Sequence, residues 1–203
     1  YNMTKENIWL VTENQERFID IGWPSDRFQD VYAVLKELKD YTEIEYDCET
    51  SGLSSFLVEK LHAFQIGIPG KQFVMDAETI DIKLFKDILE NATLYGHNLG
   101  YDFPYLYREK IVPRKVVDTY VVEYELTKGL FVPRGYRGLA ACAERYLGVT
   151  LDKTEQEKVA EGLTDVEKIL YSGRDVMYIR DIYAQQQNKV RALKLENRVH
   201  FEN

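Results

Sequence analysis

The sequence predicts an α/β protein in which helices cover both faces of a mixed β-sheet. Strand-like apolar runs gather in the first part of the chain, whereas helical periodicity dominates the last part. Internal repeats, low-complexity tracts and linker-like stretches are absent from the sequence. With 203 residues, 45% hydrophobic and 30% charged, the chain suits one large soluble domain with its own core.

The predicted strands are short apolar runs bounded by turn residues. Pro69-Gly70 separates two of these runs and is a strong turn signal. The strand segments expected from the sequence are 7–12, the start of 43–53, 62–68, 71–76, 93–98 and 115–118.

The predicted helices follow the spacing of apolar residues. Phe28, Val31, Leu35 and Leu38 recur at helical intervals in segment 27–39. The other expected helices are 80–91, 100–110, 119–129, 139–148 and a helical region from 165 almost to the C-terminus, with a break at Ser172-Gly173.

Charge and cysteine content narrow the class of protein. The net charge of −8 argues against a protein that coats nucleic acid non-specifically. Cys48 and Cys142 are far apart and suit reduced core thiols. No run approaches the ~18 apolar residues of a membrane span and no signal peptide is evident, so we expect a soluble cytoplasmic protein without a membrane partner. The chain begins with Tyr1, which suits a segment of something longer.

Asp47 and Glu49 end the strand-like run of segment 43–53. Alternate residues of a strand share one side of the sheet, so these carboxylates point the same way and repel each other. Hard divalent cations are the usual reason for such a pair. The same Asp-x-Glu spacing at 76–78 and 165–167 lacks a strand of this kind and is interpreted as solvated charge.

Two further stretches carry candidate site residues. In 94–106, Asn98 follows a strand and Asp102 begins a helix. This suits either a capping Asn98 with an Asp102 favoured by the helix dipole, or a third carboxylate at the same sheet edge. In 170–183, Tyr171 and Asp175 are four residues apart and therefore share one helix face. Alone, this second pair also suits an ordinary helical tyrosine beside a surface acid.

Three segments together resemble a known family. DCETSGL, HNLGYD and YSGRD, in this order and spacing, resemble the three motifs of the DEDD superfamily of 3′–5′ exonucleases, in the tyrosine-bearing subclass. That group includes the proofreading domain of family A DNA polymerases and RNase D. The resemblance runs from Ile8 to Gln187 and implies a ribonuclease H-like fold with a five-stranded mixed sheet. It implies one exonuclease domain over 1–203, with an N-terminal elaboration (1–40) and a catalytic core (41–190), either free-standing or part of a longer polymerase.

The resemblance also implies a metal site. By motif position, the carboxylates that would bind two Mg²⁺ ions, or Mn²⁺ in their place, are Asp47, Glu49, Asp102 and Asp175. Two such cations stabilise the attacking and leaving oxygens of a phosphodiester displacement. A tyrosine with a pKa near ~10 is a poor base at neutral pH. Tyr171 is therefore expected to orient the nucleophile, with help from Glu49.

Other positions carry weaker expectations. Leu53 corresponds to a side chain that wedges against the terminal base, or it is a core leucine. Asn98 holds the substrate strand or the motif loop rather than a metal, and Phe103 stacks on a base or faces the core. Asp118 is expected to cap a helix or support the site.

Three functions follow from the resemblance. The leading one is a 3′–5′ exonuclease that releases nucleoside 5′-monophosphates from single-stranded or frayed DNA, as in proofreading. The second is an RNase D-like exoribonuclease. The third is an inactive domain kept for nucleic-acid binding.

Overall fold

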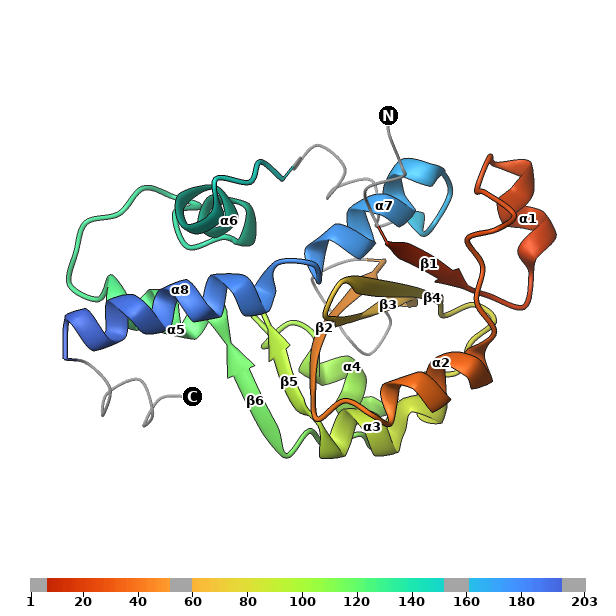
Figure 1. Cartoon of the computed structure of the whole chain (residues 1–203), viewed down its shortest axis with the longest axis horizontal. Helices are drawn as coiled ribbons and strands as arrows, with labels where there is room; N and C mark the ends of the chain where they lie inside the picture. Colours follow the sequence, from red (N-terminus) through yellow and green to blue (C-terminus); the bar gives the residue numbers. More distant parts are fainter. Residues whose placement is uncertain (1–6, 52–59, 152–160, 195–203) are drawn as a thin grey trace.

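The computed structural model describes residues 7–51, 60–151 and 161–194 (Figure 1). Six strands form one mixed sheet in the order β1-β4-β3-β2-β5-β6. β3 is antiparallel to both of its neighbours, and the other pairings are parallel. The strands are β1 Ile8–Val11, β2 Glu43–Thr50, β3 Leu61–Ile68, β4 Lys71–Asp76, β5 Thr93–Gly96 and β6 Lys115–Asp118.

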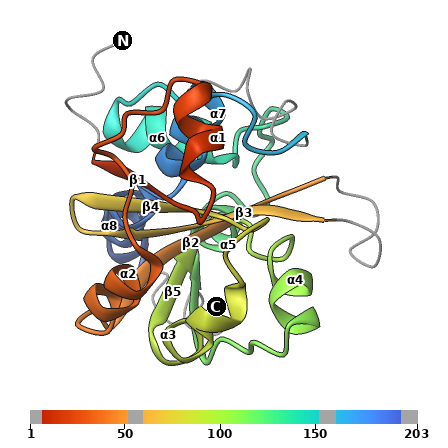
Figure 2. The same ribbon diagram turned by 90° about the vertical axis from the view of Figure 1, so that its right-hand side faces the viewer.

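Helices cover both faces of this sheet. Figure 2 shows α2, α3 and α4 on one side of the sheet and α1, α6 and α7 on the other. The helices are α1 Gln15–Asp20, α2 Val31–Leu38, the 3₁₀ helix η2 Ile82–Phe85, α3 Lys86–Asn91, α4 Phe103–Arg108, α5 Thr119–Leu126, α6 Leu139–Leu147, α7 Val166–Asp175 and α8 Ile179–Ala192. The predicted fold class is therefore confirmed.

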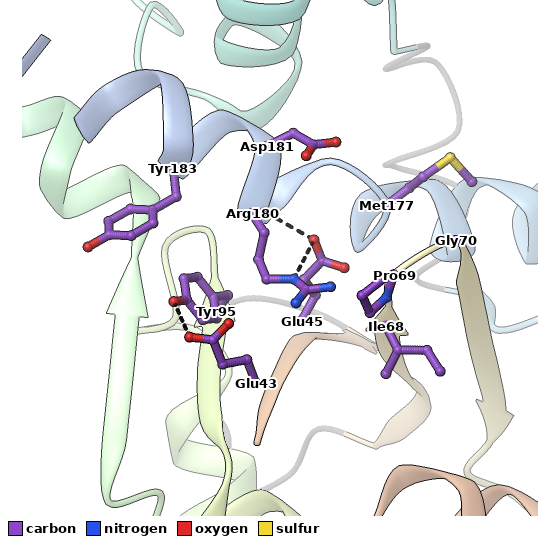
Figure 3. Close-up of a pocket in the computed structure, with 10 residues that line it drawn as sticks. All are labelled: Glu43, Glu45, Ile68, Pro69, Gly70, Tyr95, Met177, Arg180, Asp181 and Tyr183. Carbon is purple, nitrogen blue, oxygen red and sulfur yellow. Dashed lines mark hydrogen bonds and ion pairs between the residues drawn. The ribbon is translucent and has the colours of Figure 1, made fainter. Parts of the chain in front are cut away.

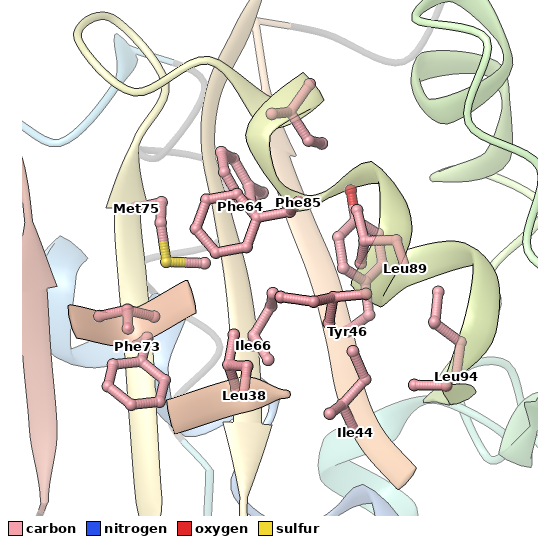
Figure 4. Packing of buried hydrophobic residues seen from close by; sticks show 14 of the residues in the cluster. Leu38, Ile44, Tyr46, Phe64, Ile66, Phe73, Met75, Phe85, Leu89 and Leu94 are labelled. Atoms are coloured by element: carbon pink, nitrogen blue, oxygen red, sulfur yellow. The ribbon is translucent and has the colours of Figure 1, made fainter. Parts of the chain in front are cut away.

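The larger core lies between the sheet and the layer of α2, η2 and α3 (Figure 4). The rings of Phe64 and Phe85 meet edge to face, with their centroids 5.2 Å apart. Tyr46 is fully buried beside them on β2. A second cluster on the opposite face packs α1 and α7 against β1 and β4, and Ile8 and Leu170 belong to it. The sheet is thus buried on both faces at its centre, as its apolar strands require.

The sheet has one strand more than the five that the resemblance implied. Segment 7–12 was expected to be a strand, and it forms β1. This strand lies at the edge of the sheet and pairs with β4, so that Ile8 lies opposite Gln72. The expected N-terminal elaboration therefore contributes a strand to the same sheet as β2.

The predicted helix break at Ser172-Gly173 is wrong. α7 continues to Asp175, and the chain turns at 176–178 before α8 begins. Gly173 sits inside the helix because a Cβ there would lie 2.8 Å from side-chain atoms of Ile8. The glycine thus allows α7 to approach β1 closely.

Other predicted helices also differ from the structure in extent, and α4 and α5 are shorter than the predicted segments 100–110 and 119–129. Helix α2 begins at Val31, later than predicted, because the side chain of Asp30 accepts a hydrogen bond from Ala33 N and caps it. Segment 80–91 is divided between the 3₁₀ helix η2 and α3. Among the described residues, no helix has the length and apolar character needed to cross a membrane.

Candidate active site

The candidate active site begins at the end of β2. Strand alternation places Asp47 and Glu49 on the side of the sheet that faces α7, and both side chains are half-buried. Cys48 lies between them and packs against the larger core on the other side. A register shift between Glu49 and Thr50 then ends the regular pairing with β3.

Helix α7 brings the third motif to these carboxylates. Carboxylate oxygens of Asp47, Glu49 and Asp175 lie within 4.8 Å of one another. The Tyr171 hydroxyl, one helical turn before Asp175, donates a hydrogen bond to the Asp175 carboxylate. The Ser172 hydroxyl lies 3.4 Å from Glu49 Oε1 and binds α7 to β2 at the site itself.

Asp102 reaches the site from the opposite side. It is the residue before α4 and is 4% exposed, yet its side chain makes no capping hydrogen bond to that helix. Its Oδ1 instead accepts a hydrogen bond from Cys48 N at 3.0 Å. Asp102 stands at the start of α4, as expected for a charge favoured by the helix dipole, and its carboxylate also lies beside Asp47 without belonging to the group of three.

Burial raises the pKa values of all four carboxyls, and repulsion by Asp47 adds to this for the other three. Loss of solvent raises the pKa of Asp47 to about 7. The pKa values of Glu49, Asp102 and Asp175 are also raised, first by desolvation and next by the negative charge of Asp47. The ionised forms of these carboxyls are therefore disfavoured, and a bound cation would stabilise them.

Tyr171 has the opposite character from a general base. Desolvation, followed by the charges of Asp175 and Glu49, raises the pKa of its hydroxyl well above the ordinary value. The hydroxyl therefore remains protonated near neutral pH and can donate a hydrogen bond.

The donor set fits a hard divalent cation. Asp47, Glu49 and Asp175 supply only carboxylate oxygens, which are the ligands that Mg²⁺ and Mn²⁺ prefer. The three oxygens are already close enough for one ion to contact them all, and Asp102 lies beside Asp47.

The loop after β5 is held by Asp118, at the end of β6. The two carboxylate oxygens of Asp118 accept hydrogen bonds from Asn98 N at 2.8 Å and Leu99 N at 2.9 Å. Oδ1 also accepts from Tyr120 N and caps α5, so the expected capping and supporting roles both occur. Asn98 itself has a φ of 66° and does not cap a helix.

Of the predicted substrate contacts Leu53 and Phe103, the structure describes only Phe103. Phe103 is the first residue of α4 and lies next to Asp102, half-buried, with its ring centroid 5.7 Å from that of Tyr107. Leu53 falls outside the described residues. Contact of either side chain with a substrate stays a prediction.

The sequence analysis did not identify two buried polar residues near the site. Glu45 is 3% exposed and lies two residues before Asp47, on the same face of β2. Gln65 is fully buried on β3 and pairs directly with Asp47. The alternation of side chains along β2 could have pointed to Glu45, whereas Gln65 required the register between strands.

Comparison with known proteins agrees with this geometry. A family model described as 3′–5′ exonuclease matches residues 25–191. The chain is 28% identical to DNA polymerase I of Aquifex aeolicus (strain VF5) over 167 residues, which are 80% of this chain and 26% of that protein. The chain therefore spans about a quarter of the length of this relative.

Solved structures share the fold at lower identity. The catalytic core of RRP6 from Trypanosoma brucei has a TM-score of 0.73 at 17% identity and covers 98% of this chain and 51% of its own. Escherichia coli RNase D has a TM-score of 0.69 at 20% identity, covering 92% and 46%. NrnC from Brucella melitensis has a TM-score of 0.68 at 18% identity, covering 95% and 86%.

The resemblance of the three motifs is thus confirmed by a family match that extends over most of the chain. The protein belongs to the 3′–5′ exonuclease family and is an exonuclease of the DEDD type.

Proposed function

We propose that the chain removes nucleoside 5′-monophosphates from the 3′ end of single-stranded or frayed DNA, by hydrolysis at a two-metal site. The observation that carries the proposal is that carboxylate oxygens of Asp47, Glu49 and Asp175 lie within 4.8 Å of one another. The Tyr171 hydroxyl is hydrogen-bonded to the last of these carboxylates. All three sequence motifs contribute to this one place, since Asp102 joins it through Cys48 N.

The four carboxylates would bind the metal ions. Asp47, Glu49, Asp102 and Asp175 would hold two Mg²⁺ ions, with Mn²⁺ able to substitute. Bound there, divalent cations supply charge that stabilises the attacking and leaving oxygens of an in-line displacement. A structure of NrnC from Brucella melitensis contains bound Mg²⁺, which supports this choice of ion.

Tyr171 and Glu49 would orient the attacking water. The protonated Tyr171 hydroxyl supplies a hydrogen bond, and the neighbouring Glu49 carboxylate accepts one. The water attacks the terminal phosphorus, the bond to the 3′ oxygen of the preceding nucleotide breaks, and that oxygen leaves with a proton. The products are a nucleoside 5′-monophosphate and a strand shorter by one nucleotide.

The choice of DNA rests on the sequence relative. DNA polymerase I of Aquifex aeolicus matches over 80% of the chain, which favours a proofreading role beside a polymerase domain in the cytoplasm. RNase D and RRP6 share the fold, so trimming of RNA is the second candidate. Matched DNA and RNA oligonucleotides of one sequence, digested with Mg²⁺, separate these candidates. We expect faster release of dNMP from DNA, and faster trimming of RNA would reject the DNA assignment.

Replacement of one site carboxylate tests the site itself. We expect Asp47→Asn to lower the rate of 3′ trimming by at least about 10²-fold, the scale of losing a catalytic group. Glu13→Gln, on the exposed segment before α1, is the matched control and should retain activity. Unchanged activity in Asp47→Asn would show that the site is elsewhere. A wild-type chain that binds single-stranded DNA but releases no nucleotide would support the inactive binding module.

A further inference from the structure

A buried carboxylate connects the strand of the candidate site to the joint between α7 and α8. Glu45 lies two residues before Asp47 on the same face of β2 and is 3% exposed. Its Oε1 accepts a hydrogen bond from Arg180 N at 3.0 Å, and the Arg180 side-chain Nε lies 3.6 Å from the same oxygen. Figure 3 shows both interactions at the start of α8.

This carboxylate caps a helix from a distance. The residue at the N-cap position of α8 is Tyr178, whose side chain makes no capping hydrogen bond. Glu45 accepts a hydrogen bond from one of the N–H groups that the first turn of α8 leaves free, and its carboxyl group lies at the positive end of the helix dipole. The start of α8 is therefore fixed to β2 rather than by its own preceding residue.

The joint is too short to decouple the two helices. Only residues 176–178 separate Asp175, the last residue of α7, from Ile179, the first residue of α8. Val176 is fully buried in this joint. A displacement of the start of α8 would therefore move the end of α7, which carries Tyr171 and Asp175.

Gly67 on β3 makes room for this arrangement. It pairs directly with Glu45 across the sheet. A Cβ on Gly67 would lie 2.5 Å from Glu45 Oε2 and 2.6 Å from the carbonyl oxygen of Val176. The carboxylate and the joint thus meet over the one position on β3 that has no side chain.

From this geometry we infer that Glu45 is a positioning residue, which sets the distance between Asp175 and the pair Asp47 and Glu49 by capping α8. The inference rests on the proposed function, because it assigns these three carboxylates to a metal site. Glu45 itself touches neither metal nor substrate in this scheme and acts through α8.

The primary test measures metal binding by the purified chain without nucleic acid. We expect Glu45→Ala to weaken Mn²⁺ affinity, titrated by calorimetry or Mn²⁺ paramagnetic resonance, by about 10- to 100-fold, as for other residues that orient metal ligands. Single-turnover trimming should slow with it. Glu45→Gln keeps an acceptor of the same length and should restore both values to within about twofold of the wild type.

The matched control is Glu43→Ala. Glu43 lies on the same strand face and carries the same charge, but it is exposed and accepts a hydrogen bond from the Tyr95 hydroxyl instead. Its loss should leave Mn²⁺ affinity unchanged. Equal weakening in Glu45→Ala and Glu45→Gln would mean that only charge matters, and it would overturn the inference.

Gly67→Ala gives an independent variant that keeps every charge. We expect it to weaken Mn²⁺ affinity because its methyl group displaces the carboxylate or the joint, and it decides the question if Glu45→Ala does not fold. Wild-type affinity in a folded Glu45→Ala or Gly67→Ala protein would overturn the inference. Asp47→Asn is measured in parallel: if it loses Mn²⁺ while Glu45→Ala does not, only the positioning role fails. If neither loses Mn²⁺, the proposed metal site fails too.

Discussion

The surroundings of the Tyr171 hydroxyl restrict the catalytic role that this group can have. It lies beside Asp175 and Glu49, and desolvation raises its pKa well above the ordinary value. A group that stays protonated cannot remove a proton from water, but it can hold a water in place.

Tyr171→Phe tests this role. The change keeps the ring and deletes the hydrogen bond to Asp175, so we expect kcat to fall by about 10- to 100-fold while the melting temperature changes little. The pH–rate profile, measured by nucleotide release, should keep its shape because Tyr171 does not titrate in the working range. If the wild-type rate instead rises with pH as the tyrosine loses its proton, and the variant lacks that rise, the tyrosine acts as a base.

The resemblance of the three motifs implied four carboxylates and a tyrosine. The structure brings Asp47, Glu49 and Asp175 together and places Asp102 beside them through Cys48 N. What the sequence could not supply was the support behind them. Gln65 lies opposite Asp47 only because of the register between β2 and β3. Asp118 was expected to cap or support, but its contact with Asn98 N exists only because β6 pairs with β5. Such partners depend on pairing between strands, which no local pattern encodes.

At the scale of elements, the contact between α7 and β1 determines where the site helix lies. Gly173 would ordinarily weaken a helix, and its replacement by alanine would ordinarily stabilise one by about 1 kcal/mol. Here a Cβ would lie 2.8 Å from Ile8, so steric overlap opposes the gain in helix propensity.

We expect Gly173→Ala to lower the free energy of unfolding by about 1–3 kcal/mol, as overpacking does. Denaturant unfolding of a double-mutant cycle measures the cause. Ile8→Ala should cost less stability in the Gly173→Ala background than in the wild type, since it removes the overlapping atoms. Additive effects would indicate that the two residues do not meet.

Helices were predicted well where apolar spacing was regular and poorly where tertiary contacts decide. Ser172-Gly173 has the composition of a break, but packing against β1 explains the glycine and α7 continues. The real joint at 176–178 contains valine, methionine and tyrosine, none of which is a breaking residue. Its position is fixed by Glu45, a residue that lies on β2. The sequence analysis also assigned no helix to 15–20, where α1 forms.

At the scale of the whole molecule, the carboxylate cluster ties stability to pH and to metal. Burial raises the pKa of Asp47 from 3.8 to about 7, so the folded protein keeps a proton that the unfolded chain releases in this range. The stability contributed by the protonated group is complete below pH 3.8 and is lost as the pH rises through about 7.

Thermal unfolding with chelator or with Mg²⁺ checks this coupling. We expect Mg²⁺ to raise the melting temperature more at about pH 8 than at about pH 5, because deprotonated carboxylates bind the ion and protonated ones do not. In chelator at about pH 8, Asp47→Asn should be at least as stable as the wild type, since it removes a buried charge. An increment from Mg²⁺ that is independent of pH, or that survives in Asp47→Asn, would place the ion elsewhere.

The overall architecture was predicted from the order of strand and helix signals. By contrast, the additional strand β1 belongs to the sheet only because it pairs with β4. Composition and periodicity indicate that 7–12 is a strand, but they do not indicate which edge it joins. This is the part of the fold that the five-stranded sheet implied by the resemblance leaves open.

The place of β1 has a practical consequence for choosing expression boundaries. The family match begins at residue 25, downstream of β1, so a fragment cut to the matched region would lack Ile8. Such a fragment would bare the hydrogen-bonding edge of β4, a surface prone to edge-to-edge aggregation, and would remove the side chain over which Gly173 rests. A low yield of such a fragment would then result from the loss of β1, and it would not indicate that the protein lacks activity.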